Sequence, residues 1–257
     1  MSKPESTTPD SYLLTTPDEI LRDAAHQVGA WLAPLRVSPT TSSTVKAVLA
    51  QYYFFNRAFV YGIIRYSGRL SEALQQGGAA LSGMTQPEVE DILATVAKIA
   101  ADECQAGGVH AGRHLHHNLL LRMGPKVGLS LAELQSGDVH QTPETALLVD
   151  TVERHFNDRN LLVGLATVSV VEGIALPMVT YLREILGGFK PAEAPPYSAH
   201  ELEHLDMHID LEVHHAADSR AVYEQVSLNR DAFDELIETV QTTLNAFTTF
   251  WGQFPTG

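Results

Sequence analysis

The stretch from Leu161 to Val179 is the feature that most restricts how this chain can fold. It is almost entirely apolar and long enough to be considered as a membrane span. However, Glu172 lies inside it and Pro177 near its end, and an ionised carboxylate is costly within a bilayer. We therefore predict a long helix over residues 159–186 that is buried in the core of a helical protein, and no membrane partner.

Helix start signals and apolar periodicity place the remaining elements. Thr16-Pro-Asp-Glu19 and Thr85-Gln-Pro-Glu88 have Thr at the cap and Glu three residues later, which is typical of a helix N-terminus. Because no strand pattern or internal repeat competes, we expect an all-α fold with a tail over residues 1–15 and a single domain over residues 16–257. The predicted helices cover residues 16–35, 43–67, 70–76, 85–123, 142–152, 159–186, 198–217, 219–226 and 231–251.

Charge and composition limit the classes of partner. Acidic residues outnumber basic ones 31 to 17, whereas nucleic acids are bound through clustered Lys and Arg, so we expect no nucleic-acid partner. Cys104 is the one cysteine and cannot form an internal disulfide. Residues 1–10 are polar and lack the apolar segment of a signal peptide. These observations favour a cytoplasmic protein.

Two helical stripes carry groups that commonly bind metal ions. Each residue of an α-helix advances by about 100°, so Glu103 and His110, seven positions apart, lie on one side of their helix. His208, Glu212 and His215 follow one another at steps of four and three, which places them on one face of a later helix. Both stripes are candidate sets of metal ligands.

Glu172 supplies the third part of the pattern. A lone carboxylate among apolar residues is costly to desolvate unless a cation or another strong partner offsets the cost. Carboxylates and imidazoles from three helices suit two iron ions, with manganese as an alternative, because these metals accept oxygen and nitrogen donors. A thiolate-rich site is excluded by the single cysteine. The predicted ligands are Glu103, His110, Glu172, His208, Glu212 and His215.

Other interpretations of these residues stay open. Glu172 can be a buried acid paired with Arg183 or with a His, and residues 201–215 can form a solvated polar face. His114 and His117 continue the stripe of the first helix, so either can line the pocket or replace a ligand. A rival stripe on the later helix consists of Asp206, Asp210 and His214.

A ferritin-like di-iron bundle is the nearest structural competitor. That class has a Glu-x-x-His pair on each of two separate helices. Here Glu201-x-x-His204 and Glu212-x-x-His215 fall on the same predicted helix, so the ferritin-like pattern is only half present.

A different family has the three-part spacing of this chain. The sequence resembles the heme-oxygenase-like di-iron oxidases and oxygenases in its order Glu103-x6-His110, a solitary Glu172, and His208-x3-Glu212-x2-His215. The resemblance spans about residues 20–250. It implies a bundle of about seven core helices in which these six residues bind two irons, with dioxygen as co-substrate.

The resemblance also implies a function. Families of this kind N-oxygenate amines and amino-acid derivatives, cleave C–C bonds of fatty or amino acids oxidatively, or desaturate them, often in natural-product biosynthesis. We expect a small amine, amino-acid or carboxylate substrate, with N-oxygenation preferred over C–C cleavage, decarboxylation or desaturation. An external electron donor and a second copy of the chain are the expected partners. A cofactor-independent or non-catalytic metal-binding protein is the further alternative.

Two details depart from or qualify the family pattern. The family usually has Asp in the middle of the last motif, where this chain has Glu212, so the geometry of that ligand can differ. Thiaminase-like relatives of the fold use a Cys nucleophile without metal. The six matched ligands argue against that branch, and Cys104 is given no role.

Overall fold

The apolar segment of the sequence forms α7 (Leu161–Gly188) at the centre of a helical bundle. The structure is a computed structural model, and it describes residues 17–37, 41–77, 84–104, 116–191, 194–225 and 230–254. Every regular element within these ranges is a helix, so the all-α prediction is confirmed. The predicted tail, residues 1–15, lies outside the described residues.

α7 is a core helix rather than a membrane span. It is long and apolar enough to cross a bilayer, yet 83% of its most apolar window is buried inside the protein. It begins after Asn160, whose side-chain oxygen accepts a hydrogen bond of 3.0 Å from the backbone N–H of Leu162. The helices that pack around it are α1 (Pro17–Val37), α2 (Ser42–Gln75), α6 (Pro143–Phe156), α8 (Glu203–Gln225) and α9 (Arg230–Gly252).

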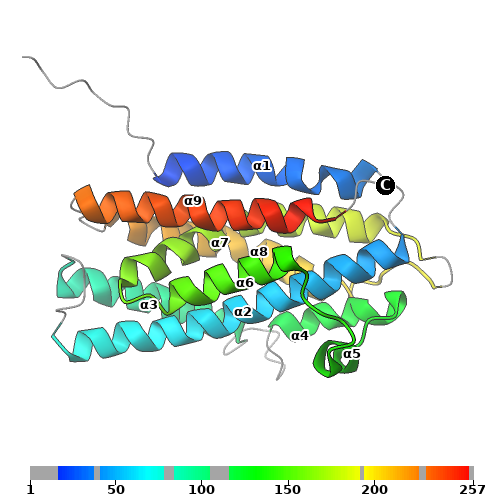
Figure 1. The fold of residues 1–257 in the computed structure, drawn as a ribbon, viewed down its shortest axis with the longest axis horizontal. Coiled ribbons are helices and arrows are strands. Elements are labelled where there is room, and N and C mark those ends of the chain that lie inside the picture. The colour runs from blue at the N-terminus through cyan, green and yellow to red at the C-terminus, as the bar shows by residue number, and fades with distance from the viewer. Residues whose placement is uncertain are drawn as a thin grey trace, which may run out of the picture.

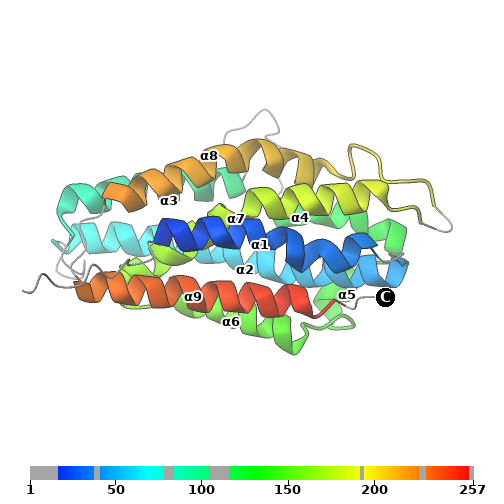
Figure 2. The ribbon, with the colours of Figure 1, turned by 90° about the horizontal axis from the view of Figure 1, so that it is seen from above.

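The long helices run mostly along one axis of an elongated bundle (Figures 1 and 2). α3 (Gln86–Glu103) packs against α2 and α8, and the short α4 (His116–Leu120) contacts the same two helices. α8 also has extensive contact with α7. Because α8 touches α3, α4 and α7, side chains on its inner face can meet groups from all three.

Glycine allows two helix pairs to approach closely. A Cβ at Gly164 of α7 would come within 2.8 Å of three ring atoms of Tyr66 in α2. The hydroxyl of Tyr66 donates a hydrogen bond of 2.6 Å to the carbonyl of Leu161. Gly62 of α2 lies in the same way beneath the ring of Phe156 in α6. The first contact holds α2 against α7, the helix that carries Glu172, and the second holds α2 against α6.

Two predicted helix breaks are wrong. The separate helices predicted over residues 43–67 and 70–76 are one continuous α2, because Gly68 stays helical with open space around it. Residues 198–217 and 219–226 likewise do not form two helices, since α8 runs without a break to Gln225. Ser198 and Glu201 make the expected reciprocal capping bonds, but these close a turn before α8 begins.

The predicted helix over residues 85–123 is interrupted. α3 ends at Glu103, and the backbone N–H of Cys104 caps it by donating to the carbonyl of the preceding turn at 3.1 Å. Residues 105–115 lie outside the described part of the chain. The chain continues as α4 and then as the 3-10 helix η1 (Leu121–Val127).

Candidate metal centre

α8 presents three polar side chains to the interior of the bundle. His208, Glu212 and His215 share one face of the helix, and each is at most 3% exposed. Asp210 and His214 of the rival stripe are exposed. The structure therefore places the His-x3-Glu-x2-His group, and not the rival stripe, at the centre of the bundle.

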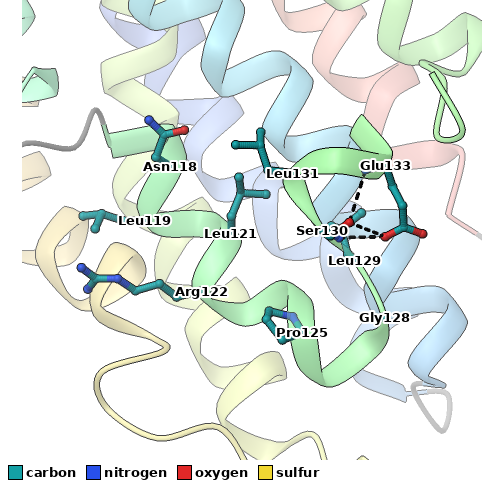
Figure 3. A pocket seen from close by; sticks show the side chains of 10 residues that line it. All are labelled: Asn118, Leu119, Leu121, Arg122, Pro125, Gly128, Leu129, Ser130, Leu131 and Glu133. Atoms are coloured by element: carbon teal, nitrogen blue, oxygen red, sulfur yellow. Dashed lines mark hydrogen bonds between the residues drawn. The ribbon is translucent and has the colours of Figure 1, made fainter. Parts of the chain in front are cut away.

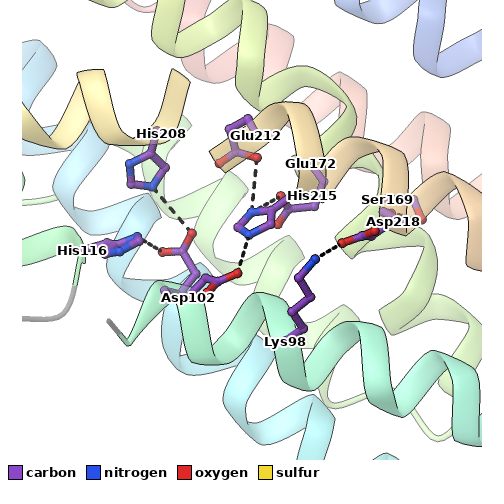
Figure 4. Close-up of polar contacts among 11 residues, drawn as sticks. Lys98, Asp102, His116, Ser169, Glu172, His208, Glu212, His215 and Asp218 are labelled. Carbon is purple, nitrogen blue, oxygen red and sulfur yellow. Dashed lines mark hydrogen bonds and ion pairs between the residues drawn. The ribbon is translucent and has the colours of Figure 1, made fainter. Parts of the chain in front are cut away.

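The end of α3 and the start of α4 contribute one side chain each. Glu103 is 3% exposed, and its two carboxylate oxygens face two different imidazoles. Oε2 lies 3.2 Å from Nδ1 of His116, and Oε1 lies 3.6 Å from Nε2 of His208 (Figure 4). These three residues bring ligand atoms within 4.8 Å of one another.

α7 contributes Glu172, which is 1% exposed. Its Oε2 lies 3.3 Å from Nδ1 of His215, and Oε2 of Glu212 lies 3.6 Å from the same nitrogen (Figure 4). The alternative partner, Arg183, is not available to it, because its guanidinium pairs with Asp206 at 2.5 Å. Glu172 is therefore part of the buried cluster and not of an ion pair with Arg183.

The described residues of the cluster form two overlapping groups of possible metal ligands. Ligand atoms of Glu103, Glu212 and His215 also lie within 4.8 Å of one another, so Glu103 belongs to both groups of three. A carboxylate has two oxygens and can contact an ion on each side. Glu103 is the residue that the two groups have in common.

Seven buried oxygen and nitrogen atoms of the cluster have no hydrogen-bond partner among the described residues. A buried polar atom without a hydrogen bond costs about 1–3 kcal/mol, and more when the group is charged. Such a concentration of unpartnered acceptors fits a bound cation, which would offset the cost. The buried atoms without a hydrogen-bond partner include Glu103 Oε2, Glu172 Oε1 and Oε2, Glu212 Oε2, His116 Nδ1, His208 Nε2 and His215 Nδ1.

The electrostatics of the metal-free cluster point the same way. Burial, followed by the charge of Glu172, raises the pKa of Glu212 to about 8. Burial opposes the charged form of His215, but Glu172 and Glu212 outweigh it and raise the pKa of that imidazole to about 11. The cluster thus retains protons that a divalent cation would displace, because metal ligands bind in their deprotonated forms.

The six predicted ligands do not all fall within the described residues. His110 lies outside them, as does His114, so the role of His110 stays a prediction. His116, which is not among the six predicted ligands, lies beside Glu103 in the place expected for an imidazole. Helical periodicity starting from Glu103 does not predict His116, because α3 ends at Glu103.

Two further histidines lie near the cluster. His117 is buried against Tyr53 and Tyr61, with ring centroids 5.6 and 5.7 Å away, and burial lowers its pKa to about 4. It is therefore packed against α2, and it belongs to neither group of close ligand atoms among the described residues. His204 is fully buried one turn before His208, with ring centroids 4.2 Å apart, and burial lowers its pKa well below the usual range.

Two of the imidazoles are also held from outside the cluster. Nδ1 of His208 lies 2.7 Å from the backbone carbonyl of His204, one turn earlier in α8. Nε2 of His215 lies 3.1 Å from Oδ2 of Asp102, which precedes Glu103 in α3 (Figure 4). The nitrogens that face the cluster are therefore Nε2 of His208 and Nδ1 of His215.

A surface pocket of about 750 Å³ lies over α4, η1 and the short α5 (Leu131–Ser136) (Figure 3). Its wall is mainly apolar, with Leu119, Leu121 and Leu129 among the lining residues. Arg122 at its edge pairs with Glu203 at the start of α8. None of the described candidate ligands lines this pocket, so it does not define a substrate site.

Comparison with known proteins places the chain in a family. The family model for iron-containing redox enzymes matches residues 73–248, which is more than half of the chain and contains every candidate ligand. The chain therefore belongs to the iron-containing redox enzyme family, within the heme-oxygenase-like superfamily.

Solved structures show the same fold. Two crystal structures of a CADD-like protein of unknown function from Nostoc punctiforme PCC 73102 each give a TM-score of 0.63. The first is 16% identical and the match covers 91% of this chain and 96% of that one. The second is 15% identical, with 93% and 94% covered. At this identity the likeness shows the fold alone. The search of curated proteins gave no match.

Proposed function

We propose that this protein is a non-heme di-iron oxidoreductase that uses dioxygen to oxidise a small molecule. The observation that carries the proposal is the group of buried carboxylates and imidazoles whose facing atoms have no hydrogen-bond partner among the described residues. Membership of an iron-containing redox family supports iron as the metal. The proposed ligands are Glu103, His116, Glu172, His208, Glu212 and His215, with His110 kept as a predicted further ligand.

In this proposal the ligands would form two adjacent iron sites. Glu103 would join the sites, because it belongs to both groups of three ligand atoms. His116 and His208 complete one site, whereas Glu172, Glu212 and His215 give the other a higher share of carboxylate. Bound iron would supply the electrons and open coordination positions for reaction with dioxygen. The apolar wall of α7 around Glu172 would exclude bulk water from the site.

The alternative function, a metal-free reaction that uses a cysteine nucleophile, is not supported by the environment of Cys104. Burial, followed by the charge of Glu103, raises the pKa of Cys104 above its ordinary value. A reactive cysteine needs the opposite shift, since the thiolate is the nucleophile. A Cys-based reaction without metal is therefore disfavoured for this chain.

Within this proposal, the substrate is a small amine, amino acid or carboxylate derivative, and N-oxygenation is preferred over C–C cleavage or desaturation. The substrate class rests on the family resemblance alone. Reaction of the iron-loaded protein with dioxygen in the presence of a panel of amines and acids tests it. An amine or amino acid should be consumed with gain of oxygen at nitrogen, whereas loss of CO2 or of two hydrogens would favour the alternative reactions.

Anaerobic titration with Fe(II) tests the metal site itself. We expect about two irons per chain to survive desalting, and an absorbance change on addition of dioxygen. His215→Ala should lower the iron content, whereas His214→Ala should not, because these adjacent residues of α8 face the cluster and solvent respectively. Failure of the wild-type protein to bind iron, or equal iron in both variants, would overturn the proposal.

A further inference from the structure

His215 makes contacts through both ring nitrogens. Nδ1 faces the cluster, 3.3 Å from Glu172 and 3.6 Å from Glu212, whereas Nε2 lies 3.1 Å from Oδ2 of Asp102. A carboxylate can only accept a hydrogen bond, so the contact with Asp102 requires a proton on Nε2. An imidazole that binds a metal ion is neutral and has one N–H, so with the proton on Nε2 the lone pair that can bind the metal is on Nδ1.

From this geometry we propose that Asp102 is a positioning residue that holds His215 with Nε2 protonated and Nδ1 directed at the metal. The inference rests on the proposed metal site. A metal-bound histidine commonly donates its second N–H to a carboxylate or carbonyl, and this contact fixes both the tautomer and the ring orientation. Asp102 supplies that carboxylate from α3, across the interface with α8.

The placement of Asp102 separates it from the ligands themselves. Its side chain is 34% exposed, whereas that of Glu103 is 3% exposed. Consecutive residues of a helix point about 100° apart, so one turn of α3 can send Glu103 into the cluster and Asp102 to the outer edge of His215. Neither group of close ligand atoms found among the described residues includes Asp102.

His208 is oriented in a similar way, but through Nδ1 rather than Nε2. Its Nδ1 lies 2.7 Å from the carbonyl of His204, so that nitrogen carries the proton and Nε2 faces Glu103. The backbone of α8 thus orients one imidazole, while a side chain of α3 orients the other. The second contact can be removed by mutation without changing α8.

The test uses Zn(II), a diamagnetic ion that binds nitrogen and oxygen sites more tightly than Fe(II). Affinities are measured by competition with a chromophoric chelator for the wild-type protein and for Asp102→Ala, Asp102→Asn and Asp91→Ala. Asp91 is an exposed residue of the same helix and serves as the matched control. Asparagine keeps an oxygen that can accept from Nε2–H, so Asp102→Asn also separates positioning from folding.

We expect Asp102→Ala to weaken Zn(II) binding by about 10- to 100-fold, which is the typical effect of removing a carboxylate that hydrogen-bonds to a metal-bound histidine. Asp102→Asn should weaken it less, and Asp91→Ala should match the wild-type protein. The 1H–15N spectrum of the Zn(II)-loaded wild-type protein should show a slowly exchanging Nε2–H of His215. In Asp102→Ala that proton should exchange rapidly with water.

The outcomes distinguish this inference from the proposed function. If Zn(II) binds but His215 carries its proton on Nδ1, or if Asp102→Ala changes neither affinity nor proton exchange, the role of Asp102 is overturned and the metal site stands. If the wild-type protein binds no Zn(II), the proposed metal site falls and this inference falls with it.

Discussion

Replacement of Glu172 by Gln should separate metal binding from the stability of the protein itself. Gln keeps the size of the side chain and removes its charge. In the metal-free protein Glu172 is 1% exposed and its charge helps to raise the pKa of Glu212 to about 8. Without that charge Glu212 can ionise beside His215, 3.6 Å away. The metal-free variant should therefore unfold at or above the wild-type temperature.

The effect on the metal-loaded protein has the opposite sign. A ligand present at 100 times its dissociation constant stabilises the folded state by about 2.7 kcal/mol. If loss of one carboxylate weakens binding about 100-fold, the same concentration gives only about 0.4 kcal/mol. For a chain of this size about 1 kcal/mol corresponds to roughly 2–4 °C. Metal should thus raise the wild-type Tm by about 5–10 °C and that of the variant by about 1 °C.

Differential scanning calorimetry under anaerobic conditions, with and without Fe(II) or Mn(II), measures both effects. Glu238→Gln removes an exposed carboxylate from α9 and serves as the control, which should keep the full metal-dependent shift. A Glu172→Gln protein that loses several degrees without metal, yet shows the wild-type shift with it, would refute the reasoning. Glu172 would then be a structural acid.

The raised pKa of Glu212 predicts a pH dependence in the metal-free protein. This carboxyl holds a proton in the folded state up to about pH 8, whereas its ordinary pKa is 4.5. The metal-free protein, prepared with a chelator, should therefore lose stability between about pH 5 and 8. Glu212→Gln should remove the part of this loss that comes from Glu212 and leave the part that comes from His215, whose pKa of about 11 makes stability fall as the pH rises above about 6.5. His116→Ala and His110→Ala should each lower the iron bound per chain. If either variant still binds two irons, the replaced histidine is not a ligand. Gly164→Ala should destabilise the protein in urea by about 1–3 kcal/mol through overpacking. Gly68→Ala, in open space on α2, should stabilise it by up to about 1 kcal/mol.

The parts of the fold that could be predicted are those in which local pattern and burial agree. The apolar run around Glu172 predicts a buried helix because its length and composition leave few other choices, and α7 is that helix. The His-x3-Glu-x2-His order predicts one helical face, and α8 buries it. The predicted breaks near Gly68 and Ser219 failed because a single weak helix former does not end a helix that packs along its whole length.

His116 shows what spacing alone cannot supply. The stripe that continues from Glu103 assumes one uninterrupted helix, but α3 ends at Glu103 and α4 begins at His116. The contact between these residues is therefore tertiary, and no helical period contains it. The contact of Asp102 with His215 could not be predicted for a similar reason, because His215 lies on another helix. Glu212 has a longer side chain than the Asp that is usual in the family at this position. It is nevertheless buried in the cluster, with 2% of its surface exposed.

Anomalous diffraction at the iron edge, from crystals grown anaerobically with Fe(II), tests the central claim most directly. The account predicts two peaks between α3, α4, α7 and α8, with Glu103 between them, one beside His208 and the other beside His215. A single peak, or iron bound elsewhere with these side chains unligated, would contradict it.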